Sequence, residues 1–163
     1  MIGDRWGVTD AEMSRRYPCD DVVPDPAWQA WRGVTVDAPP DRVWPWVAQI
    51  RLAPYSYDWV DNLGRRSPRE LRGLPEPQVG EAYSATAGRP LGTIVSVEPG
   101  AQLTAKIMGV HMSYVLVGDG QATRLLLKVI ARNGRAVGPL LAVGDLVMAR
   151  KQLLNLKELA ERR

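Results

Sequence analysis

The 163-residue chain contains no phenylalanine, one histidine and one cysteine. A single cysteine, Cys19, excludes an internal disulfide and a metal site built on several cysteines, and it favours a reducing, cytoplasmic setting. The single histidine, His111, has no cysteine or carboxylate beside it in the sequence, so its surroundings argue against a metal centre. We therefore expect neither a metal nor a cofactor.

Long apolar runs are also absent. No segment approaches the ~18 consecutive apolar residues that a membrane span needs. Residues 1–6 contain no apolar core of the kind that a signal peptide carries. We expect no integral membrane contact and no export.

A strong excess of one charge is missing as well, because 21 basic residues face 18 acidic ones and the net charge is +3. The one basic cluster, Arg65, Arg66, Arg69 and Arg72, is dispersed among prolines and glycines, which favours a solvated loop over a phosphate clamp. We expect no nucleic-acid partner. A content of 45% apolar and 24% charged residues is typical of a folded domain with a core.

The last 25 residues, 139–163, have the spacing of one long amphipathic helix. Pro139 follows Gly138, and proline is well suited to the first turn of a helix. A helix this one-sided needs a large apolar partner, for which the β-rich middle of the chain is the candidate. One apolar row follows steps of three and four and a second lies beside it: Ala142, Leu146, Ala149, Leu153, Leu156 and Ala160, then Val143, Val147 and Leu154.

The middle of the chain changes to a period of two after Gly80, which predicts strands. Asp119-Gly120 between two apolar runs is a strong hairpin signal. Within the last strand, one face carries Leu125, Leu127, Val129 and Ala131 and should be internal. The predicted strands are 81–86, 91–98, 102–108, 111–117 and 123–132, with breaks at 88–90, 99–100, 109 and 118–120.

Residues 1–30 are expected to form a lead-in arm, and residues 31–163 the domain proper. In the arm, Thr9 and Glu12 have the spacing of a capping box, which predicts a short helix from Asp10 to about Tyr17 that Pro18 ends. The domain then begins with a strand over 31–37, a helix over 42–50, a second helical piece from 57 or 58 to 63, and a loop over 65–79.

This order of elements predicts an α+β architecture, with helices on one face of an antiparallel sheet. A strongly curved sheet that grips one long helix can leave an apolar space between them. Such a space is a natural ligand site.

The stretch from Arg32 to Val47, RGVTVDAPPDRVWPWV, resembles the opening of START-like (SRPBCC) proteins, in which a strand runs into Ala-Pro and then into Val-Trp. It is most similar to the bacterial polyketide cyclase/dehydrase and lipid-transport-like branch. Gln49, the aromatic stretch 55–59 and the late hairpin at 118–125 also match, so the resemblance covers roughly residues 28–160. Arg51 departs from it, since glycine is common there.

The resemblance implies a helix-grip fold: a curved antiparallel sheet wrapped around a long C-terminal helix, with two short helices after the first strand. Members bind lipids, sterols, polyketides or plant hormones in a deep cavity, and some catalyse ring closure or dehydration. The superfamily shares no catalytic signature, so the resemblance assigns no catalytic residue here.

Candidate catalytic residues are His111, Tyr57 and Asp58. His111 could be a general base aimed into the cavity, or a hydrogen-bonded or exposed strand histidine. Asp58 could act as an acid or base, or it could cap a helix beginning at Trp59, in which case Tyr57 and Trp59 are packing residues. The hydroxyls of Tyr55 and Tyr57 could polarise a ligand carbonyl.

The expected function is binding of a small hydrophobic ligand, lipid or polyketide-like, by a monomer or homodimer. The alternatives are a cofactor-independent cyclase or dehydratase, and a protein-interaction module that uses the arm and the arginine loop 65–72. Of Trp44 and Trp46, one should be core and one should face the rim. Ten side chains are candidates for lining the cavity, although core packing would explain the methionines and Tyr114 equally well: Trp46, Gln49, Tyr55, Tyr57, Met108, Met112, Tyr114, Leu146, Ala149 and Leu153.

Overall fold

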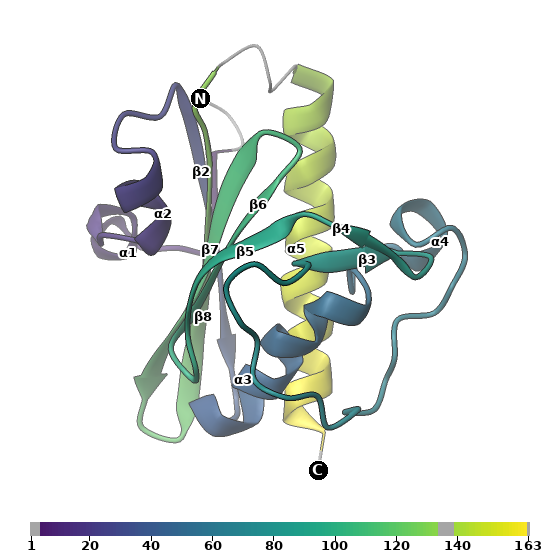
Figure 1. The fold of residues 1–163 in the computed structure, drawn as a ribbon. Helices are drawn as coiled ribbons and strands as arrows, with labels where there is room; N and C mark the ends of the chain where they lie inside the picture. Colours follow the sequence, from purple (N-terminus) through teal and green to yellow (C-terminus); the bar gives the residue numbers. More distant parts are fainter. Residues whose placement is uncertain (1–3, 134–138, 163) are drawn as a thin grey trace.

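A six-stranded sheet and one long helix dominate the structure, a computed structural model that describes residues 4–133 and 139–162, and of residues 139–146 only the backbone. The helix is α5 (Pro139–Glu161), which lies along one face of the sheet (Figure 1). All neighbouring strands are antiparallel except β1 and β2, which are parallel. The strand order is β1 (Arg5–Trp6), β2 (Trp28–Val36), β8 (Ala122–Ala131), β7 (Val110–Asp119), β6 (Gln102–Ile107) and β5 (Thr93–Glu98).

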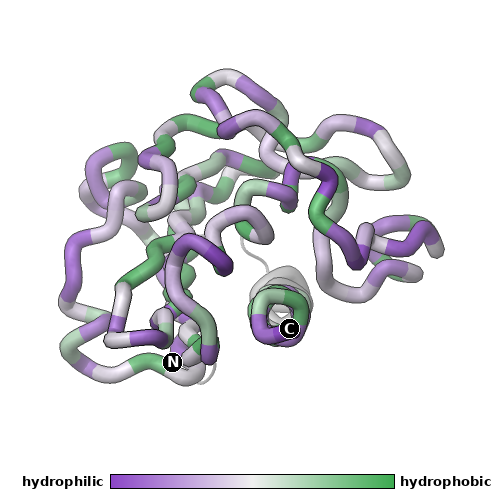
Figure 2. Tube along the Cα trace, turned by 90° about the horizontal axis from the view of Figure 1, so that it is seen from below, coloured by the Kyte–Doolittle hydropathy of each residue, from purple (hydrophilic) through white to green (hydrophobic). Residues whose placement is uncertain are grey.

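The predicted long C-terminal helix is confirmed, and the rest of the chain arches around it on three sides when it is viewed along its axis (Figure 2). Over its described side chains, its buried stripe is narrower than the sequence predicted, and its main packing partners are β2 and α3 (Pro40–Ala48). Val147 and Leu154, from the second predicted apolar row, are exposed. From residue 147 onward, the buried residues of the helix are Ala149, Gln152, Leu153, Leu156, Leu159 and Ala160.

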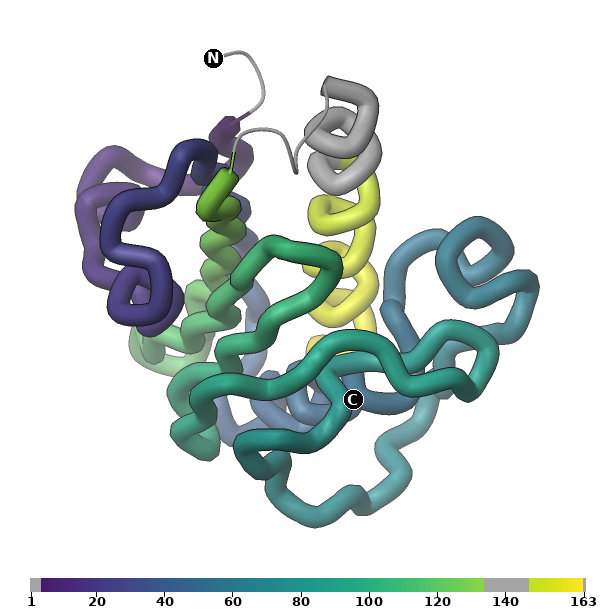
Figure 3. Tube along the Cα trace, turned by 45° about the horizontal axis from the view of Figure 1, so that its top comes forward, coloured from purple at the N-terminus to yellow at the C-terminus, as the bar shows by residue number. Residues whose placement is uncertain are grey.

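Two short helices, α1 (Asp10–Ser14) and α2 (Pro18–Val22), cover the opposite face of the sheet (Figure 3). The prediction of helices on one face only is therefore wrong. The outward side chains of β8 include Leu126 and Ile130, which are buried and pack in a second apolar cluster with α2. Around β8, both faces of the sheet are therefore buried.

The capping box predicted for the first helix is confirmed, since the Thr9 hydroxyl accepts from the Glu12 amide and the Glu12 carboxylate accepts from the Thr9 amide. This helix is shorter than predicted. Pro18, predicted to end it, is instead the first residue of α2, a position where its missing N–H breaks no helical hydrogen bond. Residues 28–30, assigned to the arm from the sequence, form the start of β2.

Ion pairs and one close backbone contact fasten the N-terminal segment to the sheet. Arg124 on β8 pairs with Glu12 at 2.7 Å, which holds the pKa of that carboxyl below its usual value. Gly7 has a positive φ of 66°, and a Cβ there would lie 2.2 Å from the carbonyl oxygen of Gly33 in β2. Only glycine allows the connection after β1 to approach the sheet this closely.

The remaining elements connect β2 to the sheet's far edge: α3, the 3₁₀ turn η1 (Gln49–Leu52), α4 (Asp58–Asp61), and a separate hairpin of β3 (Ser84–Thr86) and β4 (Arg89–Leu91). The predicted break at 88–90 is wrong in detail, because the turn falls on Ala87 and Gly88, which both have positive φ. Among the described residues, no helix is long and apolar enough to cross a membrane.

Candidate functional site

A chain of hydrogen bonds between buried polar groups joins the sheet to α5. The hydroxyl of Tyr83, just before β3, lies 2.5 Å from that of Tyr114 on β7. The Tyr114 hydroxyl donates to Oε1 of Gln152 on α5 at 2.6 Å, and Nε2 of Gln152 donates to the carbonyl of Pro54 at 2.7 Å. Because Gln152 Oε1 can only accept, Tyr83 must donate to Tyr114, which gives the chain one direction.

This polar chain lies in the main apolar core of the protein. Tyr114 is 1% exposed and Gln152 6% exposed. The sulfur of Met112 lies 3.7 Å from the Tyr114 hydroxyl. Six of the side chains predicted to line a cavity belong to this core: Trp46, Tyr55, Met112, Tyr114, Ala149 and Leu153. Leu146 was also predicted to line the cavity, but its side chain is outside the part of the chain that the structure describes.

Both tryptophans of α3 are buried, so the prediction that one of them faces a rim is wrong. Trp44 satisfies its indole N–H by donating to Glu76 at 2.9 Å. Trp46 packs edge-on against Tyr55, with ring centroids 6.4 Å apart. An aromatic pair of this geometry adds to the burial energy of the two rings.

Gln49 and Tyr55 form a second buried polar unit, and it fastens the loop that follows α4. Nε2 of Gln49 donates to the Tyr55 hydroxyl and to the Glu70 carbonyl, while Oε1 accepts from the Arg72 amide. The Tyr55 hydroxyl donates to the carbonyl of Pro68 at 2.7 Å, and burial raises its pKa. These side chains hold the wall of the core in place, and their polar groups already have partners.

A groove of about 240 Å³ lies between this loop and α5. Nδ2 of Asn155 donates to the carbonyls of Tyr55 and Ser56, one helical turn from the Gln152–Pro54 bond. Two amides of α5 therefore clamp segment 54–56, which contacts the interior polar chain at one end and lines the groove at the other. The groove is lined by Tyr55, Ser56, Asp58, Arg66, Ser67, Arg69, Lys151, Asn155, Glu158 and Leu159.

Asp58 lines this groove and does not cap α4 in the predicted way. The helix begins at Asp58 itself, and the Asp58 carboxylate accepts from the amide and the hydroxyl of Ser67, at 2.9 and 2.5 Å. The alternative packing role is also wrong for Trp59, which is 80% exposed. Tyr57 is partly exposed, with the Lys151 ammonium 5.9 Å from its ring centroid.

Asp61, which the sequence did not single out, has the most perturbed carboxyl group near the groove. Its carboxylate accepts from the Ser56 hydroxyl. Burial, reinforced by the charge of Asp58, raises the pKa of Asp61 to about 6. Among the described residues, no group of three histidine, cysteine, aspartate or glutamate side chains could hold a metal ion.

Two predicted site residues lie elsewhere. His111 shares the face of β7 with Ser113, whose hydroxyl accepts from the Cys19 amide of α2, so His111 points away from α5. Burial and the charges of Lys106 and Arg132 lower its pKa. Met108 is 78% exposed at the β6–β7 turn, with a φ of 48°. Neither side chain faces the interior between the sheet and α5, so both predictions are wrong in placement.

No family model matches the chain, and no curated protein does. Solved structures do match it. The protein MLL2253 from Mesorhizobium loti is 16% identical, with a TM-score of 0.56 over 83% of this chain and 98% of that one. The AHSA1-like protein RHE_CH02687 from Rhizobium etli is 15% identical, with a TM-score of 0.52 over 83% of each chain. CalC from Micromonospora echinospora, a self-sacrificing resistance protein, is 15% identical, with a TM-score of 0.50 over 82% of this chain and 91% of that one. At these identities the likeness establishes the fold alone.

Proposed function

From the START-like (SRPBCC) fold that this chain shares with those proteins, we propose that it binds a small, largely apolar molecule between the sheet and α5. The ligand carries at least one carbonyl or hydroxyl group. A lipid or a polyketide-like compound has this combination of an apolar body and a few polar groups.

The observation that carries this proposal is the polar chain of Tyr83, Tyr114 and Gln152 in an apolar core. Buried polar groups cost stability unless they are hydrogen-bonded, so a core used only for packing gains little from them. These groups already bond to one another and to the Pro54 carbonyl, so a ligand joins the chain by replacing one of the partners. A ligand carbonyl takes the place of Gln152 Oε1 as the acceptor for the Tyr114 hydroxyl.

The apolar part of the ligand contacts Trp46, Met112, Ala149 and Leu153, which belong to the same apolar core. Tyr55 and Gln49 keep the wall in place from behind. Access requires segment 54–56 to move away from α5, because two α5 amides hold it in the closed position.

A titration with a fluorescent apolar probe, displaced by a panel of fatty acids, sterols and aromatic polyketides, tests the proposal. We expect one saturable site. Tyr114→Phe weakens ligands with a carbonyl by about tenfold, the equivalent of one hydrogen bond of about 1.4 kcal/mol. Tyr57→Phe serves as the matched control and leaves binding unchanged, because Tyr57 lies outside the core. Absence of saturable binding across the whole panel would contradict the proposal.

The alternative function, a cyclase or dehydratase, is less well supported than binding, because two of its candidate catalytic residues are poorly placed for catalysis. A general base must reach the reacting proton, and His111 faces the N-terminal helices rather than the core. The Asp58 carboxylate is held by two bonds from Ser67. No contact described above favours catalysis over binding.

A further inference from the structure

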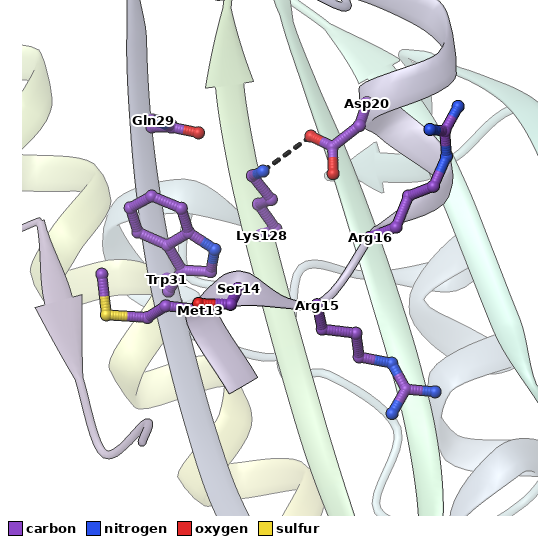
Figure 4. Close-up of a pocket in the computed structure, with 8 residues that line it drawn as sticks. All are labelled: Met13, Ser14, Arg15, Arg16, Asp20, Gln29, Trp31 and Lys128. Carbon is purple, nitrogen blue, oxygen red and sulfur yellow. Dashed lines mark hydrogen bonds and ion pairs between the residues drawn. The ribbon is translucent and has the colours of Figure 1, made fainter. Parts of the chain in front are cut away.

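An open groove of about 510 Å³ lies on the other side of the sheet, away from α5 (Figure 4). Pockets for small molecules are usually 300–1,000 Å³, a range that includes this groove and excludes the 240 Å³ groove beside α5. Strands β2 and β8 form its floor, and the connection between α1 and α2 forms its rim. The residues that line it are Met13, Ser14, Arg15, Arg16, Asp20, Gln29, Trp31 and Lys128.

Trp31 forms the floor and has an unused donor. It is 7% exposed, and its Nε1–H is buried without an acceptor. Figure 4 shows this nitrogen on the edge of the ring that faces Lys128 and Ser14. Buried indole N–H groups usually have a partner, so an acceptor is missing at this position.

Lys128, directly opposite Trp31 in the β2–β8 ladder, is 5% exposed. Its ammonium pairs with Asp20 at 2.6 Å and lies 5.1 and 5.6 Å from the rings of Trp31 and Tyr17. These contacts have a structural role that requires no ligand, because they hold α2 against the sheet. They also place a buried positive charge next to the unused indole N–H.

The rim adds further positive charge. Arg16 pairs with Asp21, whereas the Arg15 side chain forms no hydrogen bond or ion pair with any described residue. The lining thus carries three positive side chains against one carboxylate, Asp20. Packing of the N-terminal helices accounts for the Lys128–Asp20 pair, and Arg15 is exposed to solvent, but neither fact explains the buried Trp31 N–H.

We propose that this groove binds a small aromatic carboxylate, independently of the ligand between the sheet and α5. One carboxylate oxygen accepts from Trp31 Nε1–H beside Lys128. Arg15 at the rim, whose guanidinium points away from Trp31 in Figure 4, adds positive potential at longer range. The aromatic ring lies against the thioether of Met13, a favourable sulfur–aromatic contact. Carboxylate oxygens supply the acceptor that the indole lacks, and a neutral ligand does not complement the charge of the rim.

Indole resonances in ¹H–¹⁵N spectra of the whole protein test this site. 2-Naphthoate is the probe, and 2-naphthamide is its neutral isostere. The Trp31 resonance is assigned in the wild-type protein, so no variant of the buried indole is needed. We expect a saturable shift of the Trp31 N–H with naphthoate at millimolar concentrations or below, and binding at least fivefold weaker with naphthamide.

Arg15→Met separates charge recognition from simple apolar contact. It should weaken naphthoate at least threefold and leave naphthamide unchanged, whereas Arg132→Met, an exposed arginine outside the groove, changes neither. The proposal is overturned if the Trp31 resonance shows no saturable shift or if naphthamide binds as tightly as naphthoate. It is also overturned if Arg15→Met binds naphthoate as tightly as the wild-type protein does. A shift of Trp46 in place of Trp31 also overturns it, because that result places the probe in the interior.

Discussion

Replacing Tyr114 by phenylalanine removes one oxygen atom from the middle of the chain that joins the sheet to α5. The Gln152 Oε1 atom then loses its donor, and the Tyr83 hydroxyl loses this acceptor. Both groups stay buried, since the phenylalanine ring occupies the same space. The variant therefore tests hydrogen bonding with little change in packing.

The magnitude follows from which groups lose their partners. A buried polar atom left without its hydrogen bond costs about 1–3 kcal/mol, so we expect Tyr114→Phe to lower the free energy of unfolding by about 2 kcal/mol. For a chain of this length that corresponds to a drop in Tm of roughly 4–8 °C. Tyr83→Phe should cost about half as much, because Tyr114 still donates to Gln152.

Urea unfolding followed by tryptophan fluorescence measures these differences. Tyr57→Phe is the control, and it should stay within about 0.5 kcal/mol of wild type because Tyr57 is partly exposed. The double variant of Tyr83 and Tyr114 should cost little more than Tyr114→Phe alone, since the two share one bond. A loss below about 0.5 kcal/mol for Tyr114→Phe would refute the reasoning.

Two further predictions concern the groove and the N-terminal segment. The pKa of Asp61 is raised to about 6 from 3.8, so between these values the folded protein binds a proton that the unfolded chain does not. Stability from this group is therefore lost as the pH rises through 6, and Asp61→Asn should stabilise the protein by about 1 kcal/mol at pH 7.5, after allowing for partial solvation, and by clearly less at pH 5. Equal effects in denaturant titrations at both pH values would contradict this. Gly7→Ala should cost at least about 1 kcal/mol more than Gly73→Ala, because both glycines have similar positive φ, of 66° and 63°, but only Gly7 abuts a backbone oxygen. Matched melting curves check the difference, and equal losses would be evidence against the close contact.

Local pattern was sufficient for much of the fold. The helical spacing of apolar residues after Pro139 predicted α5. The boundaries of four predicted strands lie within two residues of those of β5, β6, β7 and β8. These elements have strong signals because one face is apolar and the turns carry glycine at positive φ, as at Gly100 and Gly120. The fold class predicted from this order and from the resemblance is confirmed.

The N-terminal layer was not predictable in the same way. Lys128 lies between Leu126 and Ile130 on the outward face of β8. A lysine at such a position normally indicates that this face of the strand is exposed to solvent. Its burial depends on Asp20, which is 108 residues away in sequence. A pairing over that distance leaves no periodic pattern in the sequence. The first helix of the arm was predicted, but α2 and the burial of this face of the sheet were not.

The interior polar chain was predicted only in part, because its members also come from distant parts of the sequence. Tyr114 was among the candidates, but its partners Tyr83 and Gln152 were not. Gln152 did leave a signal: it is a polar residue on the apolar stripe of α5, between Ala149 and Leu156. A polar residue on such a stripe needs a buried partner, and here that partner is Tyr114 on the sheet.

The proposal of an interior ligand site is tested most directly by native mass spectrometry of the gently purified wild-type protein, followed by extraction with organic solvent. We predict a complex at a stoichiometry of one, with an excess mass that extracts as an apolar compound bearing a carbonyl or hydroxyl group. Tyr114→Phe should lose that excess mass at lower activation energy than Tyr57→Phe. A mass equal to that of the bare chain, unchanged after incubation with fatty acids, sterols and aromatic polyketides, would contradict the account.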